Sequence, residues 1–333
     1  MTTIKPAVLV ARAVFPEVIE RLREFFDVSD NPSDEVWSRA ELSRRLASKV
    51  GALTTGSERI DAGLLAANPQ LKVVANMAVG YNNFDVPACT ARGVLCTNTP
   101  DVLTETTADF GFALLMATAR RLTESEHALR RGEWTKWAYD MFTGSDIHGS
   151  TLGILGMGRI GQAIAKRGAH GFGMRVIYHN RSKLDAATEQ SLGAKYVSKD
   201  ELLQQADHLV LVLPYSSESH HSIGADELAQ MKPTACLTNI ARGGIVDDAA
   251  LAKALAARQI AAAGLDVFEG EPSVHPALLM LPNVVLTPHI ASASVATRRA
   301  MADLAADNLI AGLGFGAHAG RPPTPINPQV LTA

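Results

Sequence analysis

The stretch Leu152-Gly-Ile-Leu-Gly-Met-Gly-Arg-Ile-Gly161 decides the fold of this chain. Its first four residues have the apolar character of a buried strand, and a helical pattern continues after it. In this setting a first glycine allows a tight turn, a second lets a pyrophosphate approach the backbone, and a third lets helix and strand pack closely. The alternative is a glycine turn in another kind of α/β protein. The predicted phosphate-binding residues are Gly156, Gly158, Arg159, Ile160 and Gly161.

Outward from this turn, short apolar runs alternate with helical patterns, which is typical of βαβ units around a mostly parallel sheet. Two series can be separated, and the length of 333 residues also favours two domains. The first series has strand candidates at residues 7–10, 51–54, 71–74 and 94–97. The second series has strand candidates at residues 152–155, 175–178, 209–213, 235–239, 263–267 and 284–286.

Several helices are marked by their start signals or by their length. Ser38-Arg-Ala-Glu41 and Ser198-Lys-Asp-Glu201 are predicted capping boxes. Residues 104–131 predict one uninterrupted helix, apolar enough to need more than one surface to cover it. A last helix is predicted at residues 294–312. Because the second series of strands ends near Pro288, we expect this helix to return to the first lobe.

The composition excludes several classes of partner. The chain has 31 basic and 34 acidic residues without a block of one sign, so we expect neither nucleic acid nor a membrane surface as a partner. Cys89, Cys96 and Cys236 lack metal-ligand spacing, so we expect small buried side chains and no metal. The apolar run at residues 7–10 is broken by Arg12 and is too short for a signal sequence. We therefore expect a cytoplasmic protein.

The residues after the strand candidate at 175–178 bear on the choice of cofactor. In NAD-selective proteins an acidic residue about 20 positions after the glycine turn accepts hydrogen bonds from the ribose 2′-hydroxyl. Here Asn180, Arg181 and Ser182 offer no carboxylate that would repel a 2′-phosphate, and Arg181 offers a cationic fork. The pattern predicts NADPH as the preferred cofactor, with NADH possible. The alternative is that Arg181 is a solvated surface charge.

Three ionisable residues follow strand candidates of the second series. Arg242, Glu271 and His289 each lie just beyond a strand, where open parallel sheets hold their ligands. Each of them alone is more often structural. Together, an arginine, a carboxylate and a histidine at the edge of the phosphate turn indicate an active site.

Five motifs together resemble one family. GMGRIG at 156–161, NIARGGIVDD at 239–248, GLDVFEGEP at 264–272 and TPHIAS at 287–292 occur in the order and spacing of the D-2-hydroxyacid dehydrogenases. VGYNNFD at 79–85 resembles the substrate loop of that family. The resemblance covers nearly the whole chain.

Three further segments resemble one branch of the family. Residues 98–108, EWTKW at 133–137 and HNRS at 179–182 are most similar to the glyoxylate/hydroxypyruvate reductases, a branch that includes 2-ketogluconate reductases. The resemblance implies NADPH-preferring reduction of small 2-keto acids, such as glyoxylate, hydroxypyruvate or 2-ketogluconate, to D-2-hydroxy acids.

The resemblance also implies roles for the residues at the strand ends. Arg242 would bind the substrate carboxylate and polarise the keto oxygen, assisted by backbone N–H groups near Val79 and Gly80. His289 would be the general acid, and Glu271 would orient it and favour its protonated form. Asp266 would contact the nicotinamide carboxamide. The cofactor groove would also be lined by Thr104, Pro214 and Ile240.

The implied fold class is α/β with two domains. A Rossmann-type doubly wound parallel sheet domain at residues 101–288 would be inserted into a flavodoxin-like substrate-binding domain made of residues 1–100 and 289–333. In related enzymes the long helix from residue 104 and the loop at 134–139 form a homodimer interface. Ordinary packing of these aromatic residues within one chain is the alternative.

Three other functions share part of this pattern. Formate dehydrogenases share the fold, but they have a neutral amide where Glu271 stands. Phosphite dehydrogenases keep the arginine, glutamate and histidine, whereas the segments around Thr104 and Trp134 are reductase-like. Corepressors of this fold use the dinucleotide as a switch for partner proteins, and they carry extended tails, whereas this chain ends soon after Pro328.

Overall fold

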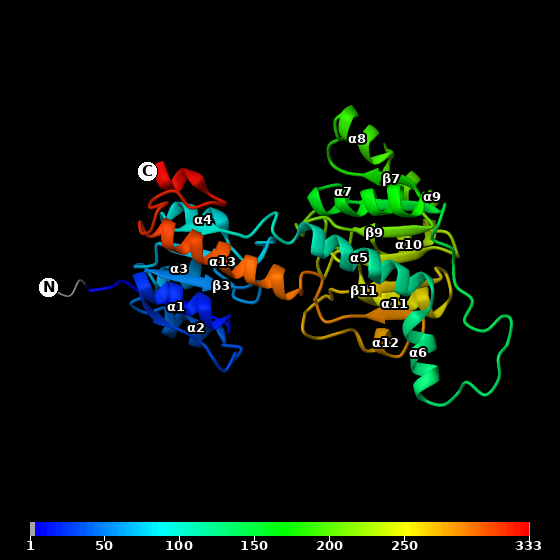
Figure 1. Cartoon of the computed structure of the whole chain (residues 1–333), viewed down its shortest axis with the longest axis horizontal. Helices are drawn as coiled ribbons and strands as arrows, with labels where there is room; N and C mark the ends of the chain where they lie inside the picture. Colours follow the sequence, from blue (N-terminus) through cyan, green and yellow to red (C-terminus); the bar gives the residue numbers. More distant parts are fainter. Residues whose placement is uncertain (1–3, 333) are drawn as a thin grey trace. The chain divides into compact units, whose positions relative to one another are not determined.

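The structure is a computed structural model that describes residues 4–332 (Figure 1). The chain divides into two compact units, one made of the residues up to Leu103 together with those from Ala293 onward, the other of Thr104–Ser292. Residues 1–3 and 333 of the predicted first domain lie outside the described residues. None of the helices in residues 4–332 combines the length and the hydrophobicity that a membrane span requires.

The first unit is built on five parallel strands in the flavodoxin-like order. Across the sheet the order is β2 (Asp27–Ser29), β1 (Ala7–Val10), β3 (Gly51–Thr54), β4 (Val73–Asn76) and β5 (Leu95–Thr97). One face carries α1 (Pro16–Phe25) and α13 (Val295–Gly312), and the other carries α2 (Arg39–Leu46), α3 (Ala62–Ala67) and α4 (Val86–Ala91). A short 3-10 turn at Pro328–Thr332 follows the tail.

The Pro-rich tail at residues 321–328 is anchored to the first unit. The side chain of Asn327 accepts a hydrogen bond from the Cys96 nitrogen at 2.8 Å. The buried side chain of Asn308, on α13, accepts one from the Thr324 nitrogen at 2.9 Å. These two hydrogen bonds hold the irregular tail against β5 and α13 of the first unit.

The second unit is built on seven parallel strands. Across the sheet the order is β12 (Val284–Leu286), β11 (Ala262–Leu265), β10 (Cys236–Asn239), β9 (His208–Leu211), β6 (Thr151–Leu155), β7 (Arg175–His179) and β8 (Ala194–Tyr196). From β6 the chain winds toward both edges, which is the doubly wound Rossmann arrangement and confirms the predicted fold class.

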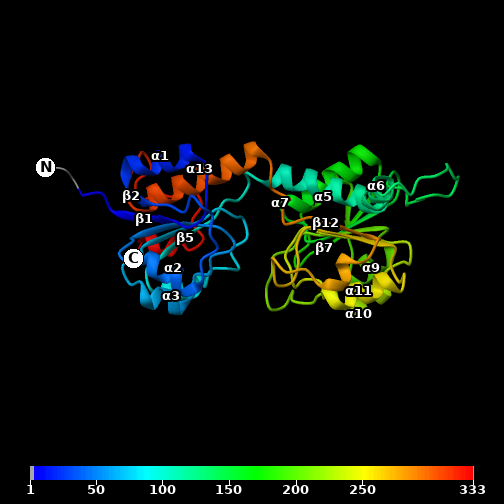
Figure 2. The ribbon, with the colours of Figure 1, turned by 90° about the horizontal axis from the view of Figure 1, so that it is seen from below.

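The helices of the second unit lie on both faces of its sheet (Figure 2). One face carries α5 (Thr104–Ala119) and α7 (Arg159–Lys166), which a π turn at Arg167–Gly171 extends; the other carries α9 (Lys199–Gln205), α10 (Ala225–Gln230) and α11 (Asp248–Ala256). The remaining helices are α6 (Leu122–Arg130), α8 (Ala186–Leu192) and α12 (Pro276–Leu279).

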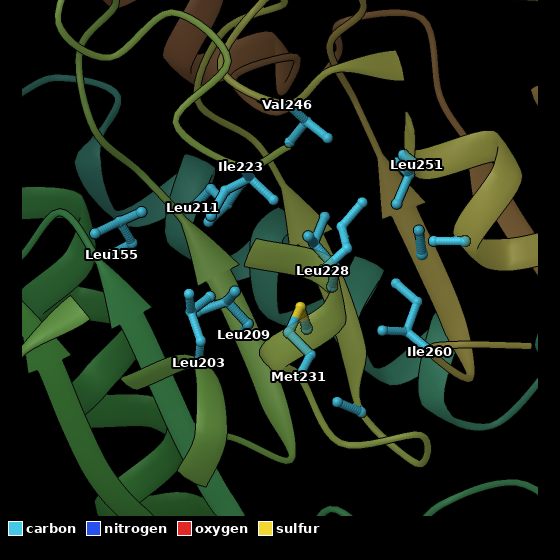
Figure 3. Close-up of a cluster of buried hydrophobic side chains, with 14 of the residues drawn as sticks. Leu155, Leu203, Leu209, Leu211, Ile223, Leu228, Met231, Val246, Leu251 and Ile260 are labelled. Atoms are coloured by element: carbon cyan, nitrogen blue, oxygen red, sulfur yellow. The ribbon is translucent and has the colours of Figure 1, made fainter. Parts of the chain in front are cut away.

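Each face of the seven-stranded sheet has its own apolar core. In the core drawn in Figure 3, Leu209 and Leu211 of β9 belong to one cluster with Leu203 of α9, Leu228 of α10 and Leu251 of α11, all fully buried. Burial of one such side chain contributes about 1.5–3 kcal/mol. Close packing on both faces fixes the positions of the strand ends, which carry the candidate site.

The prediction of one uninterrupted helix at residues 104–131 is wrong, because the structure has two helices, α5 and α6, in this range. The helix α5 ends at Ala119, and Arg121 has a left-handed φ of +52°. The carbonyl oxygen of Ala119 accepts a hydrogen bond from the Ser145 nitrogen at 2.9 Å. The Ala119 carbonyl oxygen is therefore bonded to the loop that contains Ser145, and a second helix, α6, starts at Leu122.

Two strands and half of one capping box also differ from the predictions. The strands β2 and β8 are missing from the prediction because each is a three-residue edge strand of mixed polarity. The box at Ser198 is present in full. Ser38 caps α2 through the Glu41 nitrogen at 3.2 Å, but the Glu41 carboxylate pairs with Arg44 and Arg45 instead. The three cysteines are buried, as expected.

Candidate active site

The glycine turn between β6 and α7 leaves room for a ligand beside the backbone. Gly156 has a φ of +103°, and a Cβ atom there would lie 2.7 Å from the Leu213 nitrogen. At Gly161 a Cβ atom would collide with the carbonyl oxygen of Gly156. Gly158, the N-cap residue of α7, has no atom within 4 Å of such a Cβ and no capping side chain. Close packing therefore requires the first and third glycines, and the second leaves the helix start open to an anion.

Two tyrosines hold the loop that follows β7. The hydroxyl of Tyr178 accepts a hydrogen bond from the Leu184 nitrogen at 2.8 Å, and burial raises the pKa of Tyr178 to about 12. The hydroxyl of Tyr196 donates to the carbonyl oxygen of Asn180 at 3.2 Å. The loop at residues 180–184 is thus tied at both ends, so its side chains start from a fixed backbone.

Arg181 and Ser182 project from this loop as exposed side chains. The neighbouring cation, Lys183, lies 3.2 Å from the Glu189 carboxylate. Glu218 is a carboxylate in the loop after β9. Its pKa is lowered mainly by its hydrogen bond with Ser216, and the charge of Arg181 lowers it further. Of the two cations in this loop, Arg181 is the one without a close ion pair among the described residues.

His289 and Glu271 meet at the carboxyl edge of the seven-stranded sheet. His289 Nδ1 lies 2.7 Å from Glu271 Oε2, and Glu271 Oε1 accepts a hydrogen bond from the Phe268 nitrogen at 2.9 Å. Burial raises the pKa of Glu271, but the hydrogen bond and charge of His289, the Phe268 N–H group and the Arg242 charge outweigh it and hold that pKa below its usual range. A carboxylate at Nδ1 orients the ring and leaves Nε2 for chemistry.

A buried aspartate shapes the backbone that carries His289. Asp266, after β11, is 0% exposed, and burial raises its pKa. Its carboxylate accepts hydrogen bonds from the Ile290 nitrogen at 2.8 Å, the Ala291 nitrogen at 2.9 Å and the Thr287 hydroxyl at 2.7 Å. Between these donors His289 has a φ of +53°, which side chains rarely adopt. Asp266 therefore positions His289, whereas its predicted contact with the nicotinamide stays a prediction.

Arg242 follows β10 at the same edge of the sheet. Among the residues that the structure describes, its guanidinium makes one hydrogen bond, from Nη1 to the Ala241 carbonyl oxygen at 2.6 Å. Burial lowers the pKa of Arg242, and the charge of Glu271 partly offsets this. A guanidinium stays charged at neutral pH and carries five donor groups. A partly desolvated guanidinium with unused donors is suited to bind a carboxylate in a forked geometry.

Two residues that sequence reasoning missed hold the turn at Arg242. The side-chain oxygen of Asn239 accepts a hydrogen bond from the Ala241 nitrogen at 3.1 Å. A Cβ atom at Gly243 would collide with the carbonyl oxygen of Phe268, so the turn packs directly on the loop after β11. An asparagine at the last position of a strand and a glycine after the arginine were the signals available in the sequence.

The other predicted cofactor residues of this unit lie in different surroundings. Pro214 follows β9 at the same edge, and its carbonyl oxygen accepts a hydrogen bond from the Ser219 hydroxyl at 3.1 Å. Ile240 follows β10, is 6% exposed, and packs against α5 at Gly111. Thr104 is the first residue of α5. The role of these three residues in lining a cofactor groove stays a prediction.

The predicted substrate residues Val79 and Gly80 belong to the first unit, in the loop after β4. The side-chain amide of Asn98 donates to the Val79 carbonyl oxygen at 2.8 Å, and that of Asn76 donates to the Gly80 carbonyl oxygen at 3.0 Å. Both carbonyl groups are therefore held by neighbouring strands. Substrate binding by this loop stays a prediction.

Replacement of Glu271 with Gln tests the His289–Glu271 pair through stability. Because the pKa of Glu271 is lowered in the folded chain, its carboxylate stabilises the fold above its ordinary pKa of about 4.3, and this contribution is lost as the pH falls through the lowered value. We expect the Tm of wild type to exceed that of Glu271→Gln at pH 7 and the difference to shrink as the pH falls below the ordinary pKa of a glutamate. A difference that does not change with pH would contradict the pairing.

The strand ends of the second unit thus supply complementary chemistry at one edge. The turn before α7 offers an anion site, Arg242 offers a cation, and His289 offers a ring nitrogen that can give or take a proton. Open parallel sheets bind their ligands at this edge. The residues fit the phosphates of a dinucleotide and a small substrate that carries a carboxylate.

Comparison with known proteins agrees with this fold and chemistry. Residues 112–291 match the model of the family described as D-isomer specific 2-hydroxyacid dehydrogenase, NAD binding domain. A glyoxylate reductase of Thermococcus onnurineus is 49% identical over 331 residues, which cover 98% of this chain and 97% of that protein.

Solved structures give the same result. An NADPH-dependent glyoxylate/hydroxypyruvate reductase from Sinorhizobium meliloti, in complex with NADP and malonate, has a TM-score of 0.85 at 39% identity and covers 97% of this chain and 98% of its own. A glyoxylate reductase from Paecilomyes thermophila has a TM-score of 0.86 at 34% identity and covers 98% of this chain and 99% of its own.

A Rossmann unit with this match defines an NAD(P)-dependent oxidoreductase. The chain belongs to the D-isomer specific 2-hydroxyacid dehydrogenase family, as the five sequence motifs predicted.

Proposed function

We propose that this enzyme reduces small 2-keto acids, above all glyoxylate and hydroxypyruvate, to 2-hydroxy acids, which have the D configuration where C2 is chiral, with NADPH as the preferred cofactor. The observation that carries the proposal is the 2.7 Å contact of His289 with Glu271 at the sheet edge that also holds Arg242. The names of the relatives from Thermococcus onnurineus and Sinorhizobium meliloti support the substrate class. We include 2-ketogluconate as a third candidate substrate.

The residues of the second unit divide the work of the reduction. Arg242 binds the substrate carboxylate and draws electron density toward the keto oxygen. A reduced nicotinamide dinucleotide held at the glycine turn before α7 would supply the hydride for the keto carbon. His289 gives its Nε2 proton to the keto oxygen, so that the carbonyl group becomes a secondary alcohol, or a primary one for glyoxylate. Glu271 accepts a hydrogen bond from His289 Nδ1, and this contact orients the ring for the transfer from Nε2.

The first unit contributes through its loop after β4 in this proposal. The N–H groups of Val79 and Gly80 have no hydrogen-bond acceptor among residues 4–332, while their carbonyl groups are held by Asn98 and Asn76. Two fixed and unused donors suit a carboxylate oxygen. We therefore keep both residues as proposed substrate ligands.

The test is an assay at the nicotinamide absorbance band with purified protein. NADPH and NADH are each offered with glyoxylate, hydroxypyruvate and 2-ketogluconate, and NADP⁺ and NAD⁺ are each offered with phosphite and formate. We expect turnover with glyoxylate and hydroxypyruvate. Oxidation of phosphite without reduction of any keto acid would favour the phosphite dehydrogenase alternative, and binding of NADPH without any turnover would favour a corepressor-like function.

The preference for NADPH is tested by Arg181→Ala. The guanidinium of Arg181 is exposed, and the loop that carries it is tied by Tyr178 and Tyr196. A hydrogen bond to a charged group contributes about 1.5–3 kcal/mol, so we expect the KM for NADPH to rise about tenfold to hundredfold and the KM for NADH to change little. The measurement is a pair of cofactor titrations at saturating glyoxylate.

Lys183→Ala is the matched control for this variant. Lys183 lies two residues away but already pairs with Glu189 at 3.2 Å. We expect a smaller effect on NADPH than for Arg181→Ala. An equal rise of both KM values in Arg181→Ala would make the assignment of Arg181 to the 2′-phosphate wrong.

We also propose that the enzyme is a homodimer that associates through the loop after α6. Part of this loop, which spans residues 131–150, stands away from the rest of the second unit in Figures 1 and 2, whereas Ile147 near its end is buried. It carries Trp137 at 71% and Tyr139 at 90% exposure, and α6 carries Leu122 and Leu129, which are more than half exposed. Large exposed aromatic residues are favoured at protein interfaces.

Trp137→Ala tests this interface by light scattering coupled to size exclusion. We expect wild type to elute as a dimer and the variant to need about 30-fold higher concentration to dimerise, since a central tryptophan contributes about 2 kcal/mol or more. Val36→Ala, in an 80% exposed position of the first unit, is the control. Elution of wild type as a monomer at every concentration would contradict the proposal.

A further inference from the structure

Three side chains with metal-binding chemistry lie together outside the residues assigned so far. His220 and His221, in the loop after β9, and Glu269, in the loop after β11, each offer one ligand atom, and these atoms lie within 4.8 Å of one another. His221 Nε2 is 2.9 Å from Glu269 Oε2. Ligand distances of about 2.0–2.1 Å place two ligands of one zinc ion about 3 Å apart, so this pair is already at the required spacing.

The ring of His220 is oriented by two neighbours. It stacks on the ring of His221 with the centroids 3.9 Å apart and the planes at 21°. The hydroxyl of Tyr215 lies 3.2 Å from His220 Nδ1. A hydrogen-bond partner on one ring nitrogen holds the imidazole in place and leaves the other nitrogen for an ion. Metal-bound histidines in proteins are commonly held by such a partner.

The backbone at this cluster is held from both sides. His221 has a left-handed φ of +48°, and its nitrogen donates to the Gly244 carbonyl oxygen at 2.7 Å. The nitrogen of Glu269 donates to Asp248 Oδ2 at 3.1 Å. The ligands therefore start from fixed positions on two loops, although their side chains are exposed.

We propose that His220, His221 and Glu269 form a binding site for a divalent transition metal ion, with zinc as the best fit. Two imidazoles and one carboxylate favour zinc over magnesium or calcium, which prefer oxygen ligands alone. Three protein ligands leave the fourth tetrahedral position to water. Among residues 4–332 this is the one group of three such side chains within reach of a single ion.

A bound ion would join the loop after β9 to the loop after β11. The second of these loops continues from Glu269 into Glu271, and the Gly244 carbonyl that holds His221 lies two residues after Arg242. The site therefore uses other side chains than the reacting groups but shares the loops that carry them. Without an ion, the same residues form only an exposed histidine–glutamate pair.

The experiment is a zinc titration of the full chain, from which any affinity tag has been removed and bound metal has been stripped with a chelator. Zinc binding is measured by calorimetry, and the Tm is measured with and without zinc. We expect one equivalent to bind and the Tm to rise with zinc concentration. His220→Ala is expected to weaken binding more than tenfold, and Tyr215→Phe, which removes only the orienting hydroxyl, about tenfold. His318→Ala, at an exposed histidine of the first unit, should bind as wild type does.

Two results would overturn the proposal. One is the absence of stoichiometric zinc binding to wild type. The other is equal zinc affinity in wild type and His220→Ala, which would place the ion elsewhere. Glu269→Gln provides an independent variant that keeps the side-chain volume, and equal Tm values of all variants in chelator show that a loss of binding is not a loss of fold.

Discussion

Replacement of His289 with Asn is expected to lower kcat for glyoxylate about 100- to 10,000-fold, while the affinity for NADPH stays unchanged. The amide cannot deliver a proton to the keto oxygen. Asn is the better replacement because position 289 has a φ of +53°, a conformation that Asn tolerates and Ala does not. His289→Ala should lose at least as much activity, with backbone strain added. The measurements are steady-state kinetics and a fluorescence titration with NADPH.

The control for this variant is His148→Asn, at an exposed histidine of the same unit. It should keep wild-type kinetics. A kcat of His289→Asn close to that of wild type, with normal NADPH binding, would remove His289 from the proton transfer.

Replacement of Arg242 with Lys is expected to lower kcat/KM by about 30- to 4,000-fold, because loss of a hydrogen-bonded partner from a buried charge pair costs about 2–5 kcal/mol. Lysine keeps the charge but loses the planar fork that binds both oxygens of a carboxylate. Both a higher KM for the keto acid and a lower kcat are expected, since the arginine also polarises the keto oxygen. Cofactor binding should be unaffected.

Arg242→Ala with added guanidinium ion separates a binding role from a structural one. The side chain of Arg242 makes a single hydrogen bond among the described residues, to Ala241. Its removal should therefore leave the turn intact, held by Asn239 and by the packing of Gly243. We expect guanidinium to restore part of the activity. A fully active Arg242→Ala would exclude this residue from substrate binding.

The sequence predicts the edge of the second sheet well because the signals there are local. Except for β8, the strands of that sheet are mostly buried and largely apolar, so their ends can be read from the sequence. In a parallel sheet the ends after β10, β11 and β12 lie at one edge, which brings Arg242, Glu271 and His289 to the same side. Periodicity and strand direction are sufficient for this inference.

Features that depend on distant partners could not be predicted in the same way. The break between α5 and α6 depends on a hydrogen bond between Ala119 and Ser145, and no helix-breaking residue marks it. The left-handed backbone of His289 depends on the carboxylate of Asp266, more than 20 residues earlier in the chain. Such contacts are fixed only when the strands are packed.

The same limit applies to the cluster of His220, His221 and Glu269. The pair of His221 and Glu269 joins residues that are 48 positions apart in the sequence. Two adjacent histidines in a loop do not by themselves indicate an ion site. The cluster becomes visible only because β9 and β11, which are not neighbours in the sheet, end in loops that reach each other.

The most direct test of the proposed reaction is the configuration and yield of its product. Hydroxypyruvate is incubated with NADPH and the full chain, and the glycerate formed is separated on a chiral column and compared with the NADPH consumed. We predict D-glycerate in equal amount to the oxidised cofactor. Formation of L-glycerate, or oxidation of NADPH without glycerate, would contradict the proposed hydride and proton transfer.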